Sequence, residues 1–168
     1  MTPAYSTFST PLGEFSVAVD ANNALLATAF GGVETLCQRF AAADLVRDAW
    51  RTNTVREQIA AYFAGDLRAF SLPLAPAGTS FQQSVWRALV EIPFGETRSY
   101  AQLAAAIGRP HAARAVGRAN ATNPICLIVP CHRVIGADGS LTGFAFGEEI
   151  KRRLLAHERD SALRTRAA

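Results

Sequence analysis

The strongest constraint on the fold is a helix-start signal that occurs twice in the second half of the chain. Ser80 is followed by Gln83, and Ser99 is followed by Gln102. At this spacing the serine hydroxyl accepts a hydrogen bond from the backbone three residues on, and the glutamine side chain accepts one from the backbone of the serine. Each helix start is therefore specified locally. The first predicted helix ends before Pro93. Its inward face consists of Phe81, Val85, Trp86 and Leu89.

The helices that follow Ser99 are short and are joined at a glycine. One is predicted from Tyr100 to Gly108, and the next from Pro110, because proline suits the first turn of a helix. Two short helices joined in this way indicate a helix-turn-helix.

The helix after Pro110 has a face of small residues, namely Ala112, Ala113, Ala115, Gly117 and Ala119. Gly117 costs about 1 kcal/mol of helix propensity relative to alanine, so a close approach of another group is expected. Tight packing against a neighbouring helix is the common explanation. In a helix-turn-helix, a smooth face that carries Arg114 and Arg118 also suits nucleic acid, and we favour this second hypothesis.

The first half of the chain has a different pattern. Alternating hydropathy over residues 12–30 predicts a hairpin with a turn at residues 20–23. Helical periodicity follows over residues 33–40 and 55–63, and it places Cys37 on a buried face.

Chain-breaking residues over 72–78 mark a boundary between the two halves. We therefore predict an α+β protein. Residues 1–76 form a small α/β domain with an antiparallel sheet, and residues 77–168 form a mostly helical domain with the helix-turn-helix. The last helix, with Leu154 inward, is predicted to fray from Ser161 onward.

Composition excludes several classes of protein. With 49% hydrophobic and 18% charged residues among 168, the chain is too apolar to be disordered. No apolar stretch approaches the roughly 20 residues that span a bilayer, and the N-terminus lacks the basic region and apolar block of a signal peptide, so we expect a cytoplasmic protein. Three cysteines without zinc-type spacing predict neither a disulfide framework nor a metal site.

Residues 130–134, Pro-Cys-His-Arg-Val, carry the chemistry, and they follow a predicted buried strand. A thiolate is a strong nucleophile, and a histidine that takes the thiol proton makes it available near neutral pH. On an extended segment, however, adjacent side chains point to opposite sides. Cys131 and His132 would then meet only through a bend or a bridging water molecule.

The net charge of +3 favours an anionic partner only weakly. The distribution of arginines is more informative, because several surround the predicted nucleophile: Arg98, Arg109, Arg114, Arg118 and Arg133. This clustering is typical of proteins that bind a polyanion.

Residues 123–134, Asn-Pro-Ile-Cys-Leu-Ile-Val-Pro-Cys-His-Arg-Val, resemble the active-site signature of the O6-alkylguanine-DNA alkyltransferases, also called methylated-DNA-protein-cysteine methyltransferases. Other blocks are similar to the family and follow its order: residues 79–86, 92–100, 112–117 and 154–158. The resemblance covers residues 79–158, whereas the first half is similar only in size and coarse pattern.

The resemblance implies direct reversal of DNA damage. O6-alkylguanine, chiefly O6-methylguanine, would be flipped out of double-stranded DNA, because a stacked base hides its reacting atom. Its alkyl group would move irreversibly to Cys131. The thioether has no hydrolytic exit, so each molecule would react once, with no cofactor and no metal. We expect a monomer that acts on DNA and not at a membrane.

The resemblance also implies roles for individual residues. Cys131 would be the nucleophile, His132 its base through a water molecule, and Glu158 the partner that holds the imidazole tautomer. The Tyr100 hydroxyl would reach N3 of the base, and Arg114 would fill the vacated place in the stack. The full DNA-binding set is Ser99, Ala112, Ala113, Arg114, Gly117 and Arg118. The substrate-pocket set is Asn123, Val134, Phe144, Ala145 and Lys151.

Within that pocket, the carbonyls of Cys131 and Val134 would accept from the guanine amino group, and the amide of Ala145 would address O6. Asn123 would tie the helix-turn-helix to the active-site loop.

Two departures from the family leave the substrate range open. Phe144 stands where the family commonly has tyrosine, and Phe146 where glycine is frequent. An aromatic ring at 146 adds a stacking wall or narrows the cavity. Two other functions are also open: a binder that grips alkylated DNA without transfer, against which Cys131 counts, and a thiol hydrolase, which would need an oxyanion hole and turnover.

Overall fold

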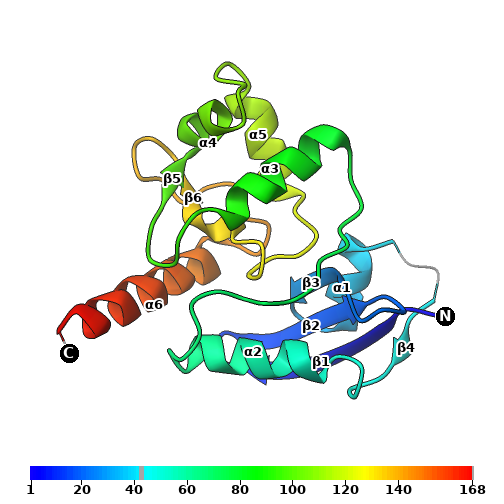
Figure 1. Ribbon diagram of the computed structural model, residues 1–168. Coiled ribbons are helices and arrows are strands. Elements are labelled where there is room, and N and C mark those ends of the chain that lie inside the picture. The colour runs from blue at the N-terminus through cyan, green and yellow to red at the C-terminus, as the bar shows by residue number, and fades with distance from the viewer. Residues whose placement is uncertain (42–43, 168) are drawn as a thin grey trace. The chain divides into compact units, whose positions relative to one another are not determined.

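The computed structural model of the protein describes residues 1–41 and 44–167, with side chains through Arg164 (Figure 1). The chain divides into two compact units, Met1–Ala77 and Gly78–Ala168. Sheet and helices in the first unit and mostly helices in the second confirm the predicted α+β class.

The first unit is built on a sheet with the strand order β3-β2-β1-β4. Its strands are β1 (Ala4–Thr10), β2 (Gly13–Val19), β3 (Leu25–Phe30) and β4 (Val46–Arg47). Strands β2 and β3 form the predicted antiparallel hairpin. Strand β1 pairs antiparallel with β2 along its whole length, and sequence patterning missed it. Its mixture of buried and half-exposed residues, AYSTFST, lacks a clean alternation.

Helices α1 (Val33–Arg39) and α2 (Asn53–Phe63) complete this unit. In α2, Val55, Ile59 and Tyr62 are buried, as the periodicity predicted. In α1 only Leu36 is buried, and Cys37 is exposed, so its predicted burial is wrong. Successive residues of a helix are rotated by about 100° around its axis. With Leu36 facing inward, Cys37 therefore points away from the core.

The second unit is assembled mainly from helices, of which α6 (Glu148–Ala167) is the longest (Figure 1). They are α3 (Ser80–Val90), α4 (Tyr100–Ala106), α5 (Ala113–Ala121), the 3₁₀ turn η1 (Cys131–Arg133) and α6 (Glu148–Ala167). Two short strands, β5 (Arg98–Ser99) and β6 (Val134–Ile135), pair in parallel. The core between α3, α4 and α5 contains Val85, Trp86, Leu89, Leu103 and Val116.

The capping boxes start α3 and α4, with one correction. Ser99 accepts from the amide of Gln102 at 3.1 Å, and Gln102 Oε1 accepts from the Ser99 amide at 2.8 Å, as predicted. In α3 the box is formed by Thr79 and Gln82, one residue before the predicted pair. Both pairs have the required spacing, and Ser80 is already helical.

Helices α4 and α5 pack together as the predicted helix-turn-helix, but α5 begins at Ala113 and not at Pro110. The Ala112 amide donates to Arg109 O at 2.9 Å, which closes a separate turn before the helix. At its other end, α6 continues to Ala167, so the predicted fraying from Ser161 is wrong for the described backbone. The Ser161 side chain is buried, which fixes this part of the helix.

Within the described residues, no helix combines the length and apolar character needed to cross a membrane.

Candidate active site

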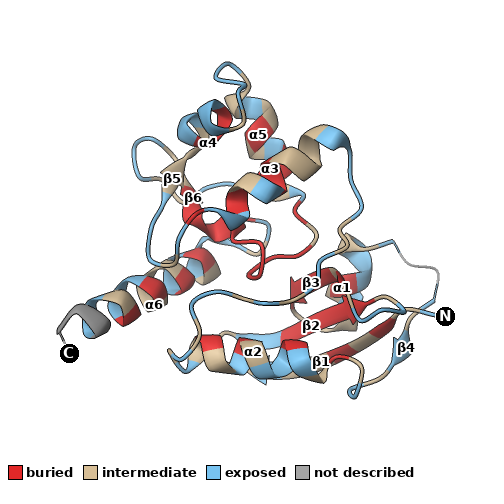
Figure 2. Ribbon diagram, viewed as in Figure 1, coloured by how far each residue is buried: buried red, intermediate tan, exposed pale blue. Residues whose placement is uncertain are grey.

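Cys131 and His132 lie in the 3₁₀ turn η1, and the predicted strand before them is a compact loop. Within it the Val129 amide donates to Ile125 O at 2.9 Å, and Leu127 has a φ of 74°. Figure 2 shows this segment between α5 and η1 as almost entirely buried. The prediction of a strand was wrong because continuous apolar character marks burial and does not by itself mark extension. The turn also removes the strict alternation that would have separated Cys131 from His132.

Asn123 connects the end of α5 to this loop. Its side-chain Nδ2 donates to Val129 O at 2.9 Å, and its Oδ1 accepts from the Ile125 amide at 3.0 Å. The residue is 1% exposed. The amide group of Asn123 therefore holds both ends of the loop that leads to Cys131.

His132 and Glu158 form a buried pair between η1 and α6. His132 Nε2 lies 2.7 Å from Glu158 Oε2, and the two side chains are 0% and 1% exposed. Burial acts to raise the pKa of Glu158, but attraction and hydrogen bonding from His132 and Arg133 outweigh it, so the pKa lies well below its usual range. An ionised carboxylate only accepts, so His132 Nε2 carries the hydrogen.

The other ring nitrogen of His132, Nδ1, can accept a proton. His132 Nδ1 is buried and has no hydrogen-bond partner among the described residues. With Nε2 donating to Glu158, Nδ1 is the basic nitrogen of the ring. The next residue back along the chain is Cys131, which is 5% exposed.

Tyr100 and Lys151 approach the thiol from α4 and α6. Partial burial raises the pKa of Tyr100, and the charge of Cys131 adds to the effect. Its hydroxyl donates to Thr142 O at 3.2 Å, in the loop between β6 and α6. Burial lowers the pKa of Lys151, opposed by the charges of Cys131 and Glu148. The Lys151 ammonium donates to Val134 O at 2.6 Å.

These contacts distinguish the two carbonyls predicted to accept from guanine. Cys131 O already accepts from the Val134 amide and, at 3.3 Å, from Asn120 Nδ2. A carbonyl has two lone pairs, so this oxygen is fully used. Val134 O accepts from Lys151 and has one lone pair left in these contacts.

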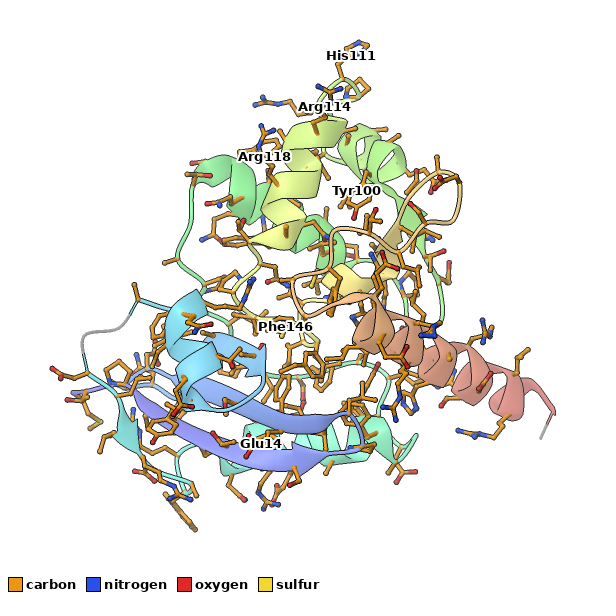
Figure 3. The ribbon with its side chains drawn as sticks, turned by 180° about the vertical axis from the view of Figure 1, so that it is seen from behind. Glu14, Tyr100, His111, Arg114, Arg118 and Phe146 are labelled. Atoms are coloured by element: carbon orange, nitrogen blue, oxygen red, sulfur yellow. The ribbon has the colours of Figure 1, made fainter. Side chains whose placement is uncertain are left out.

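The outer face of α5 carries exposed cations and small residues. Figure 3 shows His111, Arg114 and Arg118 extending outward from α5 and the turn before it. Ala112, Ala113 and Gly117 lie half-exposed on the same helix or at its start. A Cβ at Gly117 would meet nothing nearer than the Tyr100 ring at 3.7 Å, an ordinary contact. Packing within the protein therefore does not require glycine here.

Among the arginines predicted to face a polyanion, Arg133 is an exception. It is 6% exposed, and its guanidinium is bound to Glu158 in the interior. The sequence pattern predicted a surface cation here. A buried arginine can be recognised only when its acidic partner, here Glu158, is known.

In the part of the chain that the structure describes, no three His, Cys, Asp or Glu side chains gather as a metal site would require.

Comparison with known proteins places these features in one family. Residues 80–160 match the model of the DNA-binding domain of 6-O-methylguanine DNA methyltransferase, and residues 4–76 match its ribonuclease-like domain. The chain belongs to the 6-O-methylguanine DNA methyltransferase family.

Individual family members are similar over most of the chain. The methylated-DNA–protein-cysteine methyltransferase of Methanosarcina acetivorans is 46% identical over 92% of this chain and 97% of its own length. That of Methanosarcina barkeri is 60% identical over 62% of this chain and 66% of its own length. The crystal structure of Mycobacterium tuberculosis OGT in complex with DNA matches with a TM-score of 0.85 and 42% identity, covering 94% of both chains.

Phe144 and Phe146, the two departures from the pattern of the 6-O-methylguanine DNA methyltransferase family, lie in one loop. The Phe144 and Phe146 rings meet edge-on, with centroids 5.8 Å apart and an interplanar angle of 64°. Phe144 is buried, Phe146 is half-buried, and Ala145 between them is exposed. The two rings thus stabilise one another within the loop that also carries Thr142, the acceptor of the Tyr100 hydroxyl.

Sequence reasoning missed Asn120 and the inward role of Arg133. Asn120 is 2% exposed, and it donates to the carbonyl of the cysteine. Its position on the inner face of α5, next to Ala119 and one turn after Val116, was a periodicity signal that could have identified it.

Proposed function

We propose that this protein repairs DNA by direct reversal, moving the alkyl group of O6-alkylguanine, chiefly O6-methylguanine, to the sulfur of Cys131. The supporting observation is a buried thiol whose neighbour His132 is oriented by Glu158 at 2.7 Å, in the unit that carries the helix-turn-helix. A base held in one tautomer next to a thiol is the arrangement that activates a nucleophile.

The reaction balances without a cofactor. His132 Nδ1 takes the thiol proton through a water molecule, and the thiolate attacks the alkyl carbon. The S–C bond forms as the C–O6 bond breaks, and the bond's electron pair goes to guanine. The base takes up one proton and leaves neutral. Because a thioether is not hydrolysed, each protein molecule reacts once.

The contacts to the flipped guanine are assigned to hydrogen-bonding groups of the pocket that can still accept or donate. The Val134 carbonyl accepts from the guanine amino group, and the backbone amide of Ala145, an exposed residue, addresses O6. The Tyr100 hydroxyl donates to N3 and assists departure of the base. In the free protein that hydroxyl is bound to Thr142 O, so base entry exchanges one acceptor for another. The saturated Cys131 carbonyl contributes only if Asn120 moves.

DNA is bound through the outer face of α5. Small residues at 112, 113 and 117 let the helix backbone approach the minor groove, with Ser99 and Arg118 at the phosphates. Arg114, at the exposed face, enters the stack in place of the flipped base. Extrusion is required because chemistry at O6 cannot proceed inside the duplex. Phosphate contacts of this kind make binding fall steeply with salt.

We further propose that the protein works as a monomer in the cytoplasm. A reducing compartment keeps Cys131 as a thiol, and an oxidising one would consume it.

The test is incubation with duplex DNA containing O6-methylguanine, followed by peptide mass spectrometry. Addition of one methyl group to the peptide that contains Cys131, and none in Cys131→Ser, supports repair. Tight binding without transfer would instead indicate a binder. No binding and no transfer would leave a thiol hydrolase, and the proposal would fail.

A further inference from the structure

Arg133 is built into the interior as the second partner of the Glu158 carboxylate. Its Nε donates to Glu158 Oε1 at 2.8 Å, and its Nη2 donates to Oε2 at 3.0 Å. The remaining nitrogen, Nη1, donates to Ile92 O at 2.7 Å. The guanidinium carbon also lies 5.8 Å from the centroid of the Phe94 ring. Each of the three guanidinium nitrogens therefore donates a hydrogen bond.

The carboxylate of Glu158 is saturated by these contacts. Oε1 accepts from Arg133 Nε and, at 3.3 Å, from the Gly95 amide, and Oε2 accepts from Arg133 Nη2 and His132 Nε2. A carboxylate offers about four lone-pair positions, and here each has a donor. Oε2, the oxygen that holds the imidazole, therefore has no freedom to rotate away.

The same contacts decide the charge that His132 experiences. An unpaired buried carboxylate next to an imidazole strongly favours the protonated ring. Here the negative charge of Glu158 is matched by the positive charge of Arg133, so His132 lies beside a neutral pair. Glu158 then orients the ring as a hydrogen-bond acceptor.

We propose that Arg133 is a positioning residue that shares the Glu158 carboxylate and thereby keeps His132 unprotonated and oriented to receive the proton of Cys131. This inference rests on the proposed alkyl transfer, and it assigns a role to a residue that touches neither base nor DNA. The two residues act together. Glu158 fixes the tautomer of His132, and Arg133 offsets the negative charge that would otherwise keep the imidazole protonated.

Other charged and titratable groups near the site do not replace this contribution. Cys131 precedes His132 in η1, and Lys151 from α6 and Tyr100 from α4 interact with the thiol. The Lys151 ammonium is committed to Val134 O. These groups stay the same when Arg133 is replaced, so a difference between variants reports Arg133 itself.

The test measures protonation of His132 directly, by ¹⁵N NMR of the ring nitrogens against pH in the full chain. Arg133→Gln should move the pH of half-protonation upward by about one unit or more, since an opposing charge is lost. Glu158→Gln should move it downward, because the attracting charge is lost. Opposite shifts are a signature that general loosening of the pocket would not produce.

Arg133→Lys separates charge from geometry. It keeps the positive charge but cannot make the two-pronged contact, so the half-protonation pH should stay near that of the natural protein. Its single-turnover methyl transfer should fall about tenfold or more at every pH, because misplacement of a catalytic group costs rate. This variant also decides the matter if Arg133→Gln does not fold.

An unchanged or lowered half-protonation pH in Arg133→Gln would overturn the inference, as would full transfer activity in Arg133→Lys. Failure of the proposed function would look different, because the unmodified protein itself would then not transfer a methyl group.

Discussion

Replacing Glu158 by glutamine should destabilise the C-terminal unit strongly at neutral pH. The substitution keeps the volume but presents an amide to a site where four donors converge. It also leaves the buried guanidinium of Arg133 without a counter-charge. Removing one partner of a buried pair costs about 3 kcal/mol or more, so the free energy of unfolding should fall by that amount.

The effect should depend on pH in a defined direction. The pKa of Glu158 is lowered in the folded protein, so its stabilisation is complete above the unfolded value near 4.5 and is lost as the pH falls. The difference between the natural protein and Glu158→Gln should therefore narrow by about 1.4 kcal/mol for each pH unit below that value.

The assay is urea unfolding followed by tryptophan fluorescence in a Trp50→Phe background. Trp86 is then the only tryptophan, and it is buried in the C-terminal unit, so it reports that unit alone. Asp160→Asn is the matched control, because Asp160 is an exposed carboxylate on the same helix and should cost no more than about 1 kcal/mol. A pH-independent difference in unfolding free energy, or one no larger than that of the control, would contradict a stabilising role for the Glu158 carboxylate.

Three further substitutions test the DNA-binding and reactive residues. Cys131→Ser should keep affinity for O6-methylguanine DNA in gel-shift titrations while methyl transfer disappears. Arg114→Ala should weaken affinity and flipping, seen as lower fluorescence of 2-aminopurine placed at the target position, whereas the exposed Arg87→Ala on α3 should not. Gly117→Ala should raise thermal stability through about 1 kcal/mol of helix propensity, yet lower affinity for DNA because the new methyl group keeps the backbone from the groove. Unaltered DNA affinity in Gly117→Ala would contradict a close approach of the α5 backbone to the groove.

Local signals predicted most of the C-terminal fold because they involve residues close in sequence. Ser99 and Gln102 specify a helix start through contacts three residues apart, and the structure has them as predicted. The same rule misplaced the start of α3 by one residue, since Thr79 and Ser80 both satisfy it. Local rules therefore predict the existence of a helix better than its boundary.

Errors arose where tertiary contacts decide the outcome. The apolar run before Cys131 is equally consistent with a strand and with a buried loop, and Asn123 selects the loop by bonding both of its ends. Cys37 was predicted to be buried, but in the short helix α1 the buried residue is its neighbour Leu36. The partnership of Arg133 with Glu158 spans 25 residues, so nothing in the local sequence distinguishes it from a surface arginine.

The family resemblance joins Cys131, His132 and Glu158 in one hypothesis on the amino-acid sequence alone, and the structure places His132 and Glu158 in contact. The sequence does not reveal the state of the hydrogen-bond acceptors in the pocket. The Cys131 carbonyl is saturated, and the Tyr100 hydroxyl is bound to Thr142 O, so a base must displace existing hydrogen bonds to enter.

The most direct test of the account is the stoichiometry of transfer from excess duplex DNA with a labelled O6-methylguanine. We predict that label in the protein rises to one methyl group per molecule, stays there, and maps entirely to Cys131. Continued turnover beyond one equivalent, or a methyl group found on another residue, would contradict it.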